Sequence, residues 1–195
     1  SGAFDTLSHC METYMGKPQA TNLSDEINEA VMRNVITNLR RLIRNPDDDF
    51  ARGELMWASA MAENGMLKLG KQTDFQCHMI EHAVGAYTDC NHGQGLAVIH
   101  PALYRRLLEA GKEKLARMAE TVWGVKGTTI EETAMRGIEA LEAFIREIGL
   151  PTHWSEMGIT DESMLRAAAD TCFITPGCCR QLTRDEIFEL LMERM

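Results

Sequence analysis

The chain has 195 residues, 45% of them hydrophobic and 25% charged, a balance typical of one globular domain large enough to bury a core. The formal net charge of -9 argues against a nucleic-acid-binding surface. No apolar run approaches the roughly 20 residues of a membrane span and no signal-peptide pattern is visible, so we expect a cytoplasmic protein without membrane contact.

The first predicted helix carries an acidic residue and a histidine four positions apart, Asp5 and His9. This spacing places a carboxylate oxygen and an imidazole nitrogen on one helical face, which is half of a metal site. Aspartate combined with neutral imidazoles suits Zn, Fe(II) or Mn and does not suit a metal that prefers thiolates. The helix is expected to end at residues 16–18, which read Gly-Lys-Pro.

Two further helices are predicted before the histidine-rich stretch. Asn22 or Ser24 can cap the first, whose apolar residues recur at helical spacing up to about residue 44. The segment from Asp49 to Leu69 is apolar on nearly all sides, which predicts a central, buried helix. After a loop, Thr73 or Asp74 is expected to cap the next helix.

The stretch from Cys77 to Pro101 contains four of the six histidines. His78 and His82 are four residues apart, so on a helix they share one face and lie about 6 Å apart along the axis. His92 follows His78 by fourteen residues, which is roughly 21 Å on a straight helix and too far for one metal ion. Turn-forming residues at positions 88–91 predict a reversal that would bring His92 beside His78. Spacing alone does not decide between His78 and His82 as the ligand.

The six cysteines show neither a CxxC pair nor the spacing of a secreted disulfide framework, which predicts reduced thiols. Three of them, Cys10, Cys77 and Cys90, lie beside the candidate ligands and are alternative metal ligands. Because neighbouring residues on a helix point about 100° apart, we favour the histidines. Glu81 is interpreted as pointing away from the site, to hydrogen-bond elsewhere or face solvent.

Capping signals and helical periodicity predict the remaining helices. Pro101 is expected to bend or restart the helix that follows the histidines. Later helices are expected at residues 112–123, 129–148, 161–173 and 184–194. The second should start at a capping box of Thr129 and Glu132, and the last should be capped by Thr183 with Glu186 three residues on. No segment alternates with period two over the length of a strand, so the sequence predicts an all-α fold of about eight or nine helices.

Two motifs resemble a known family. They are GAFDTLSHCME at the start and HMIEHAVGAYTDCNHGQGLAVIHPAL roughly seventy residues later. Together they resemble the metal-binding domain of the iron-containing alcohol dehydrogenases, in particular the butanol dehydrogenase-like branch. The resemblance covers most of the chain and implies the multi-helix C-terminal domain of that family, which has the dehydroquinate synthase-like fold.

The resemblance also implies roles for individual residues. Four of them would bind a divalent metal: Asp5, His9, His78 and His92. Fe(II) would be the native ion, with Zn(II) or Ni(II) as alternatives. His82 would lie in the substrate and nicotinamide pocket, where it passes a proton outward or shapes the pocket. Gly93 and Gly95 would let the backbone approach the cofactor closely.

The implied activity is that of an oxidoreductase that interconverts a primary alcohol and its aldehyde with NAD or NADP, assisted by a Lewis-acidic metal. Residues 1–195 are interpreted as one metal-binding domain. The resemblance implies an N-terminal α/β nucleotide-binding domain upstream. This sequence has no G-x-G-x-x-G fingerprint for a dinucleotide, so the chain alone is expected to be inactive. The other expected partner is the small-molecule alcohol or aldehyde, and a homodimer is one option for the assembly.

Two other functions fit the same residues. Aspartate and histidine ligands with an open position can activate water equally well, as in a metal-dependent lyase or hydrolase, which would turn over its substrate without nicotinamide. A non-catalytic helical domain could use the metal for structure or storage, and its site would be closed, with no vacant position.

Overall fold

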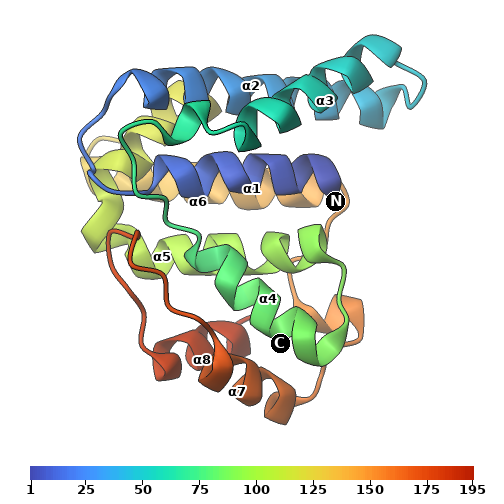
Figure 1. Ribbon diagram of the computed structural model, residues 1–195. Coiled ribbons are helices and arrows are strands. Elements are labelled where there is room, and N and C mark those ends of the chain that lie inside the picture. Colours follow the sequence, from blue (N-terminus) through green and yellow to red (C-terminus); the bar gives the residue numbers. More distant parts are fainter.

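Helix α1 (Gly2–Tyr14) runs through the middle of the molecule (Figure 1). The structure, a computed structural model, describes residues 1–195. α1 packs against α2 (Leu23–Arg44), α3 (Asp49–Glu63) and α5 (His92–Met118). Because most of its residues are buried, α1 is a rigid base for the side chains that it carries.

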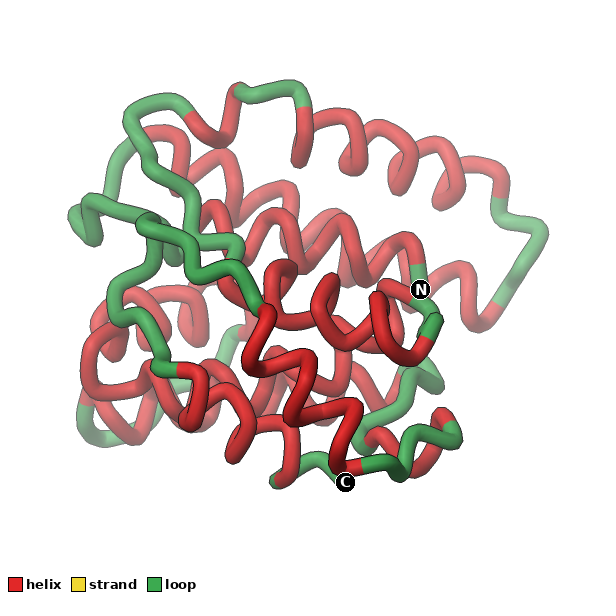
Figure 2. Tube along the Cα trace, turned by 60° about the horizontal axis from the view of Figure 1, so that its bottom comes forward, coloured by secondary structure: helices red, strands yellow, loops and turns green.

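The remaining helices surround α5. α4 (Gln76–Thr88) packs against α5 and α7 (Glu162–Thr171), α6 (Ile130–Glu147) lies along α5, and α8 (Arg184–Met192) packs on α7. One continuous apolar core includes residues from α1 through α8, and no strand is present (Figure 2). The predicted all-α fold is therefore confirmed. None of the helices combines the length and the apolarity that crossing a bilayer requires.

Three helices begin where their capping signals predict. Asn22, Thr129 and Thr183 each accept a hydrogen bond from the backbone N–H three residues further on. At Asn22 and Thr183 the acidic residue at that third position bonds back to the cap, which completes a capping box. The capping box predicted at Thr129 does not form, because the side chain of Glu132 accepts from the backbone N–H of Thr128 instead. These local contacts need no tertiary partner, and this is why the sequence alone could place them.

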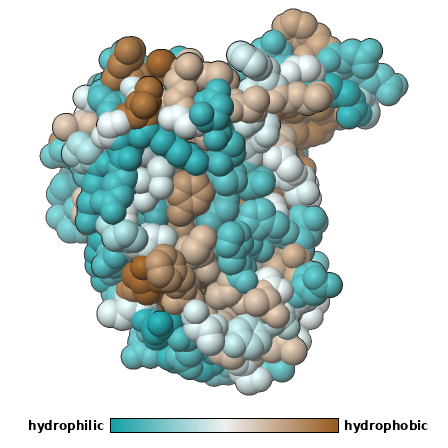
Figure 3. Space-filling model, in the orientation of Figure 1, coloured by the Kyte–Doolittle hydropathy of each residue, from teal (hydrophilic) through white to brown (hydrophobic).

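The expectation of a buried helix at residues 49–69 is wrong. α3 ends at Glu63 and is followed by a short 3-10 turn, and only three alanines of α3 are buried. Met56 is 76% exposed and Trp57 is 65% exposed. Apolar atoms accordingly appear on the protruding part of the surface formed by α2 and α3 (Figure 3). α3 packs through its small residues, so its large apolar side chains face outward.

The chain reverses between α4 and α5, as predicted. Asp89 has a left-handed conformation with φ 53° that ends α4, and Asn91 caps α5 by accepting a hydrogen bond from the backbone N–H of Gln94. α5 then continues through Pro101 and through residue 112, where a separate helix was expected. A π-helical turn, Ala119–Trp123, follows it. The extensive packing of α5 along α6 offsets the one backbone hydrogen bond that a proline removes.

A buried charged cluster ties α1, α2 and α5 together. Asp25 Oδ1 lies 2.8 Å from Lys71 Nζ, and Asp25 Oδ2 lies 2.5 Å from Lys114 Nζ. All three side chains are almost fully buried, and both ammonium groups lie over the ring of Tyr14. One carboxylate therefore compensates two buried cations, so the stability of this cluster depends on Asp25.

Candidate metal centre

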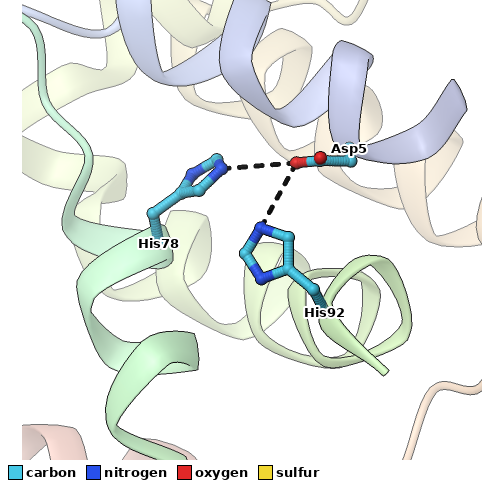
Figure 4. A group of neighbouring side chains, drawn as sticks. All are labelled: Asp5, His78 and His92. Carbon is cyan, nitrogen blue, oxygen red and sulfur yellow. Dashed lines mark ion pairs between the residues drawn. The ribbon is translucent and has the colours of Figure 1, made fainter. Parts of the chain in front are cut away.

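Three side chains from three helices, Asp5, His78 and His92, bring possible ligand atoms within 4.8 Å of one another beside α1 (Figure 4), and His9 lies next to Asp5 and His78. Asp5 Oδ1 lies 3.4 Å from His78 Nε2, 3.4 Å from His92 Nε2 and 3.5 Å from His9 Nε2. His9 Nε2 and His78 Nε2 are 3.2 Å apart. The structure thus brings together the four residues that the sequence analysis proposed as ligands, from α1, α4 and the first residue of α5.

The four separations just given match those between neighbouring ligand atoms of one metal ion. Metal–ligand bonds of about 2.1 Å place neighbouring ligand atoms about 3.4 Å apart. Asp5 Oδ1 is buried and has no hydrogen-bond partner, an arrangement that costs free energy unless a cation compensates it. His9 and His78 also direct their Nε2 atoms at each other, so a metal ion that displaces the proton between them can bind both nitrogens. The residues present therefore fit a divalent metal.

Each histidine of the cluster has a carboxylate beside its other ring nitrogen, Nδ1. The pairs are His78 with Glu12, His92 with Glu81 and His9 with Glu63. In the third pair the two atoms are 2.6 Å apart but out of line for a hydrogen bond. An ionised carboxylate only accepts hydrogen bonds, so Nδ1 of His78 and of His92 must carry hydrogen. Their Nε2 atoms can then bind a metal.

The cluster perturbs the pKa values of its own members. Burial lowers the pKa of His78, but its interactions with the carboxylates of Asp5 and Glu12 outweigh burial and raise it to about 9. Burial raises the pKa of Asp5, but the interactions with the three histidines outweigh burial and lower it. Burial, and then repulsion from His78, lower the pKa of His9. Because a metal must displace the proton of His78, we expect tighter metal binding as the pH rises.

His82 lies at the edge of the cluster, on the exposed side of α4. Its ring centroid is 5.2 Å from that of His92 and 6.0 Å from that of His78. His82 is not in the group formed by Asp5, His78 and His92, but with Glu81 and His92 it forms a second group whose possible ligand atoms all lie within 4.8 Å of one another. Burial, and then repulsion from His92, lower its pKa, which favours a neutral imidazole that can accept a proton.

The two glycines that open α5 pack against other parts of the chain. A Cβ atom at Gly93 would lie 2.7 Å from the backbone oxygen of Ser1, and one at Gly95 would lie 2.8 Å from Glu81 Cγ. Both contacts are too short for any side chain, so close packing within the chain explains why these positions hold glycine. The role of both glycines in cofactor approach stays a prediction.

A cleft of about 550 Å³ opens between α1 and α3 and reaches two members of the cluster, Asp5 and His9. Its walls include Leu55 and Met56 from α3. The cleft therefore combines polar groups at the cluster with an apolar wall, and it offers a route by which a small molecule could reach the metal centre.

The sequence analysis missed Glu12 and Glu63 and placed Glu81 away from the site. Glu81 is in fact buried and hydrogen-bonded to His92, because the start of α5 folds back onto α4. Glu12 lies three residues after His9 and Glu81 three residues after His78, so helical spacing did contain a signal for both. Glu63 had no such signal, because its contact depends on how α3 packs.

The cap of α4 also differs from the prediction. Neither Thr73 nor Asp74 caps the helix, and the residue before it, Phe75, has a left-handed conformation with no side-chain cap. Glu12 of α1 instead accepts hydrogen bonds from the first backbone N–H groups, those of Cys77 at 2.5 Å and His78 at 3.3 Å. A buried carboxylate from another helix thus replaces the local cap.

Comparison with known proteins identifies relatives along the whole chain. Residues 1–195 match the family model for the C-terminal part of the Fe-containing alcohol dehydrogenase family. NADH-dependent butanol dehydrogenase A of Clostridium acetobutylicum is 32% identical over 195 residues, which covers 97% of this chain and 50% of that protein. The NADPH-dependent aldehyde reductase YqhD of Escherichia coli is 29% identical over 164 residues, which covers 84% of this chain and 42% of that protein.

Solved structures share the fold. The crystal structure of NADH-dependent butanol dehydrogenase A from Thermotoga maritima superposes with a TM-score of 0.90 and 29% identity, covering 99% of this chain and 51% of the other. The structure of the aldehyde reductase YqhD from E. coli, free of substrate and cofactor, superposes with a TM-score of 0.89 and 27% identity. The match covers 100% of this chain and 52% of the other. The chain spans about half the length of the curated relatives it matches. It belongs to the Fe-containing alcohol dehydrogenase family, of which it represents the C-terminal domain.

Proposed function

We propose that this chain is the metal-binding part of an NAD(P)-dependent alcohol dehydrogenase that interconverts a primary alcohol and its aldehyde. The observation that carries this proposal is the convergence of Asp5 Oδ1 with the Nε2 atoms of three histidines, at separations of 3.4, 3.4 and 3.5 Å. Relatives named as a butanol dehydrogenase and an aldehyde reductase support the choice of substrate class.

We assign the metal to four ligands: Asp5, His9, His78 and His92. The mixed oxygen and nitrogen donors suit Fe(II), and the family name supports iron as the native metal. Zn(II) and Ni(II) bind such donors more tightly than Fe(II), so purified protein can carry them instead. When bound, a divalent metal supplies a Lewis acid that favours loss of the proton from an alcohol.

The residues around the cluster bind the alcohol and move its proton. The cleft between α1 and α3 would hold the alkyl chain against Leu55 and Met56, which also reduces the access of water. His82 would accept the alcohol proton on one side and release it to solvent on its exposed side, as its lowered pKa favours. Gly93 and Gly95 remain our candidates for the close approach of the nicotinamide.

We further propose that residues 1–195 form one helical domain and that an α/β nucleotide-binding domain precedes it. The relatives are about twice as long as this chain, and this sequence has no dinucleotide fingerprint. A cytoplasmic location fits six cysteines that are all free.

The test uses the complete protein and the 195-residue chain side by side, each loaded with Fe(II) without oxygen. We expect the complete protein to reduce NAD or NADP in the presence of butanol and to lose this activity with a chelator. The chain alone should bind the metal and reduce neither cofactor, because nothing holds the nicotinamide against the substrate. Reduction by the chain alone would show that the cofactor site is misplaced. Substrate turnover without nicotinamide would favour a lyase or hydrolase.

A further inference from the structure

A single buried carboxylate connects the start of α4 to the metal centre. Glu12 is 0% exposed and accepts hydrogen bonds from three donors, the backbone N–H groups of Cys77 and His78 and the ring Nδ1–H of His78. α4 has no side-chain cap of its own. The backbone of α4 and the ring of a proposed ligand are thus held by the same group.

We propose that Glu12 is a positioning residue of the metal centre, which fixes where α4 begins and which nitrogen of His78 faces the metal. This inference rests on the proposed metal site. Its basis is the hydrogen-bond geometry, because an acceptor at Nδ1 places the lone pair of the ring on Nε2.

The position of Glu12 on α1 makes this control direct. Asp5, His9 and Glu12 lie on the same well-buried helix, with Glu12 seven residues, about two helical turns, after Asp5. Helix α1 therefore carries two ligands and also sets the position of the third, His78. The separation of 3.4 Å between Asp5 Oδ1 and His78 Nε2 depends on the contact of Glu12 with α4. Without that contact the His78 ring can turn its other nitrogen toward the metal.

The pair formed by Glu81 and His92 repeats the arrangement. The carboxylate of Glu81 is buried and holds Nδ1 of His92. Gly95 makes this possible, because a Cβ atom there would lie 2.8 Å from Glu81 Cγ and Oε1. The third pair differs, since the side chain of Glu63 is 48% exposed and is out of line with His9 Nδ1. Glu63 therefore provides a matched control for the loss of one negative charge near the metal.

Replacement by glutamine separates positioning from packing. Glu12→Gln keeps the volume of the side chain, and its amide oxygen can still accept from the backbone of α4. Its amide NH2 would then face His78 Nδ1 and favour the tautomer with hydrogen on Nε2, which cannot bind a metal. Glu81→Gln would act on His92 in the same way and lies away from the start of α4.

The experiment measures Co(II) and Zn(II) binding to the 195-residue chain and to three variants, Glu12→Gln, Glu81→Gln and Glu63→Gln. Affinity is measured by competition with a chromophoric chelator, and the visible spectrum of bound Co(II) reports the ligand geometry. We expect Glu12→Gln and Glu81→Gln to weaken binding about 10- to 100-fold and to change the Co(II) spectrum. Glu63→Gln should weaken binding less than about threefold and leave the spectrum unchanged.

Three outcomes would overturn the proposal. They are wild-type affinity and spectrum in a folded Glu12→Gln variant, equal losses in all three variants, and no metal binding by the wild-type chain. If circular dichroism shows that Glu12→Gln is unfolded, the test relies on Glu81→Gln. Wild-type metal affinity and a wild-type Co(II) spectrum in Glu81→Gln would then overturn the proposal. If the variants lose metal affinity as expected but the complete protein lacks dehydrogenase activity, only the proposed function is refuted.

Discussion

The buried histidine His100 should make the stability of this protein fall in mild acid. His100 is 0% exposed in α5, and its Nε2 lies 2.6 Å from Ser8 Oγ. Burial, and then repulsion from His78, lower its pKa from 6.5 to about 3. The folded protein therefore holds this ring neutral over a pH range in which the unfolded chain protonates it.

The sign and size of the effect follow from proton linkage. Below pH 6.5 the unfolded state binds a proton that the folded state does not take up until about pH 3, so the free energy of unfolding falls as the pH falls. Each pH unit in this window costs about 1.4 kcal/mol. Between pH 6.5 and 5 the loss attributable to His100 is thus about 2 kcal/mol. This is a large fraction of the stability of a typical domain.

The assay is urea unfolding of the metal-free chain at pH 7, 6 and 5, for the wild type and for His100→Gln. The variant is expected to be less stable at pH 7, but its free energy of unfolding should change by about 2 kcal/mol less between pH 7 and 5. His153→Gln controls for the removal of a histidine from the surface, where the side chain is exposed, and should follow the wild type. Parallel pH profiles for the wild type and His100→Gln would refute the reasoning.

Three further predictions concern the metal ligands, the buried charges and the thiols. His78→Ala or His92→Ala should abolish metal binding in equilibrium dialysis while His82→Ala keeps it, and a complete loss in His82→Ala would make His82 a ligand. Asp25→Asn should destabilise the fold by about 3–5 kcal/mol in urea unfolding, because two buried ammonium groups lose their carboxylate. Its control, Glu147→Gln at the exposed pair with Arg40, should cost less than about 1 kcal/mol, and equal costs would contradict this account. Thiol titration of unfolded, non-reduced protein should find all six cysteines free, and a lower count would contradict the predicted reduced state.

Local signals predicted the parts of the fold that depend on neighbours in the sequence. The caps at Asn22, Thr129 and Thr183 involve residues within one helical turn, and the chain reversal before His92 follows from turn-forming residues. The extent of α5 was not predictable in the same way. A proline and a polar stretch suggest an interruption, and only the packing of α5 along α6 shows why the helix continues.

The candidate site likewise has residues that local motifs predict and contacts that depend on tertiary packing. The pairs at spacing four and the family motifs indicated Asp5, His9, His78 and His92, and the structure places them together. Helical spacing placed Glu12 on the same face as His9, but the contact of Glu12 with His78 joins residues 66 positions apart, which periodicity within one helix cannot predict. The exposure of α3 could not be predicted for a related reason. An apolar composition does not specify which face of a helix the rest of the protein covers.

The exposed side chain of Trp57 gives this protein an internal optical reporter. Tryptophan emission shifts to shorter wavelength when the indole leaves water, and Trp57 lies on α3, the helix that forms one wall of the cleft. The other two tryptophans provide a steady background, since Trp154 is fully buried with its Nε1 bonded to the backbone oxygen of Leu191 and Trp123 packs against Phe144. Fluorescence can therefore follow, without any label, whether another molecule covers α3.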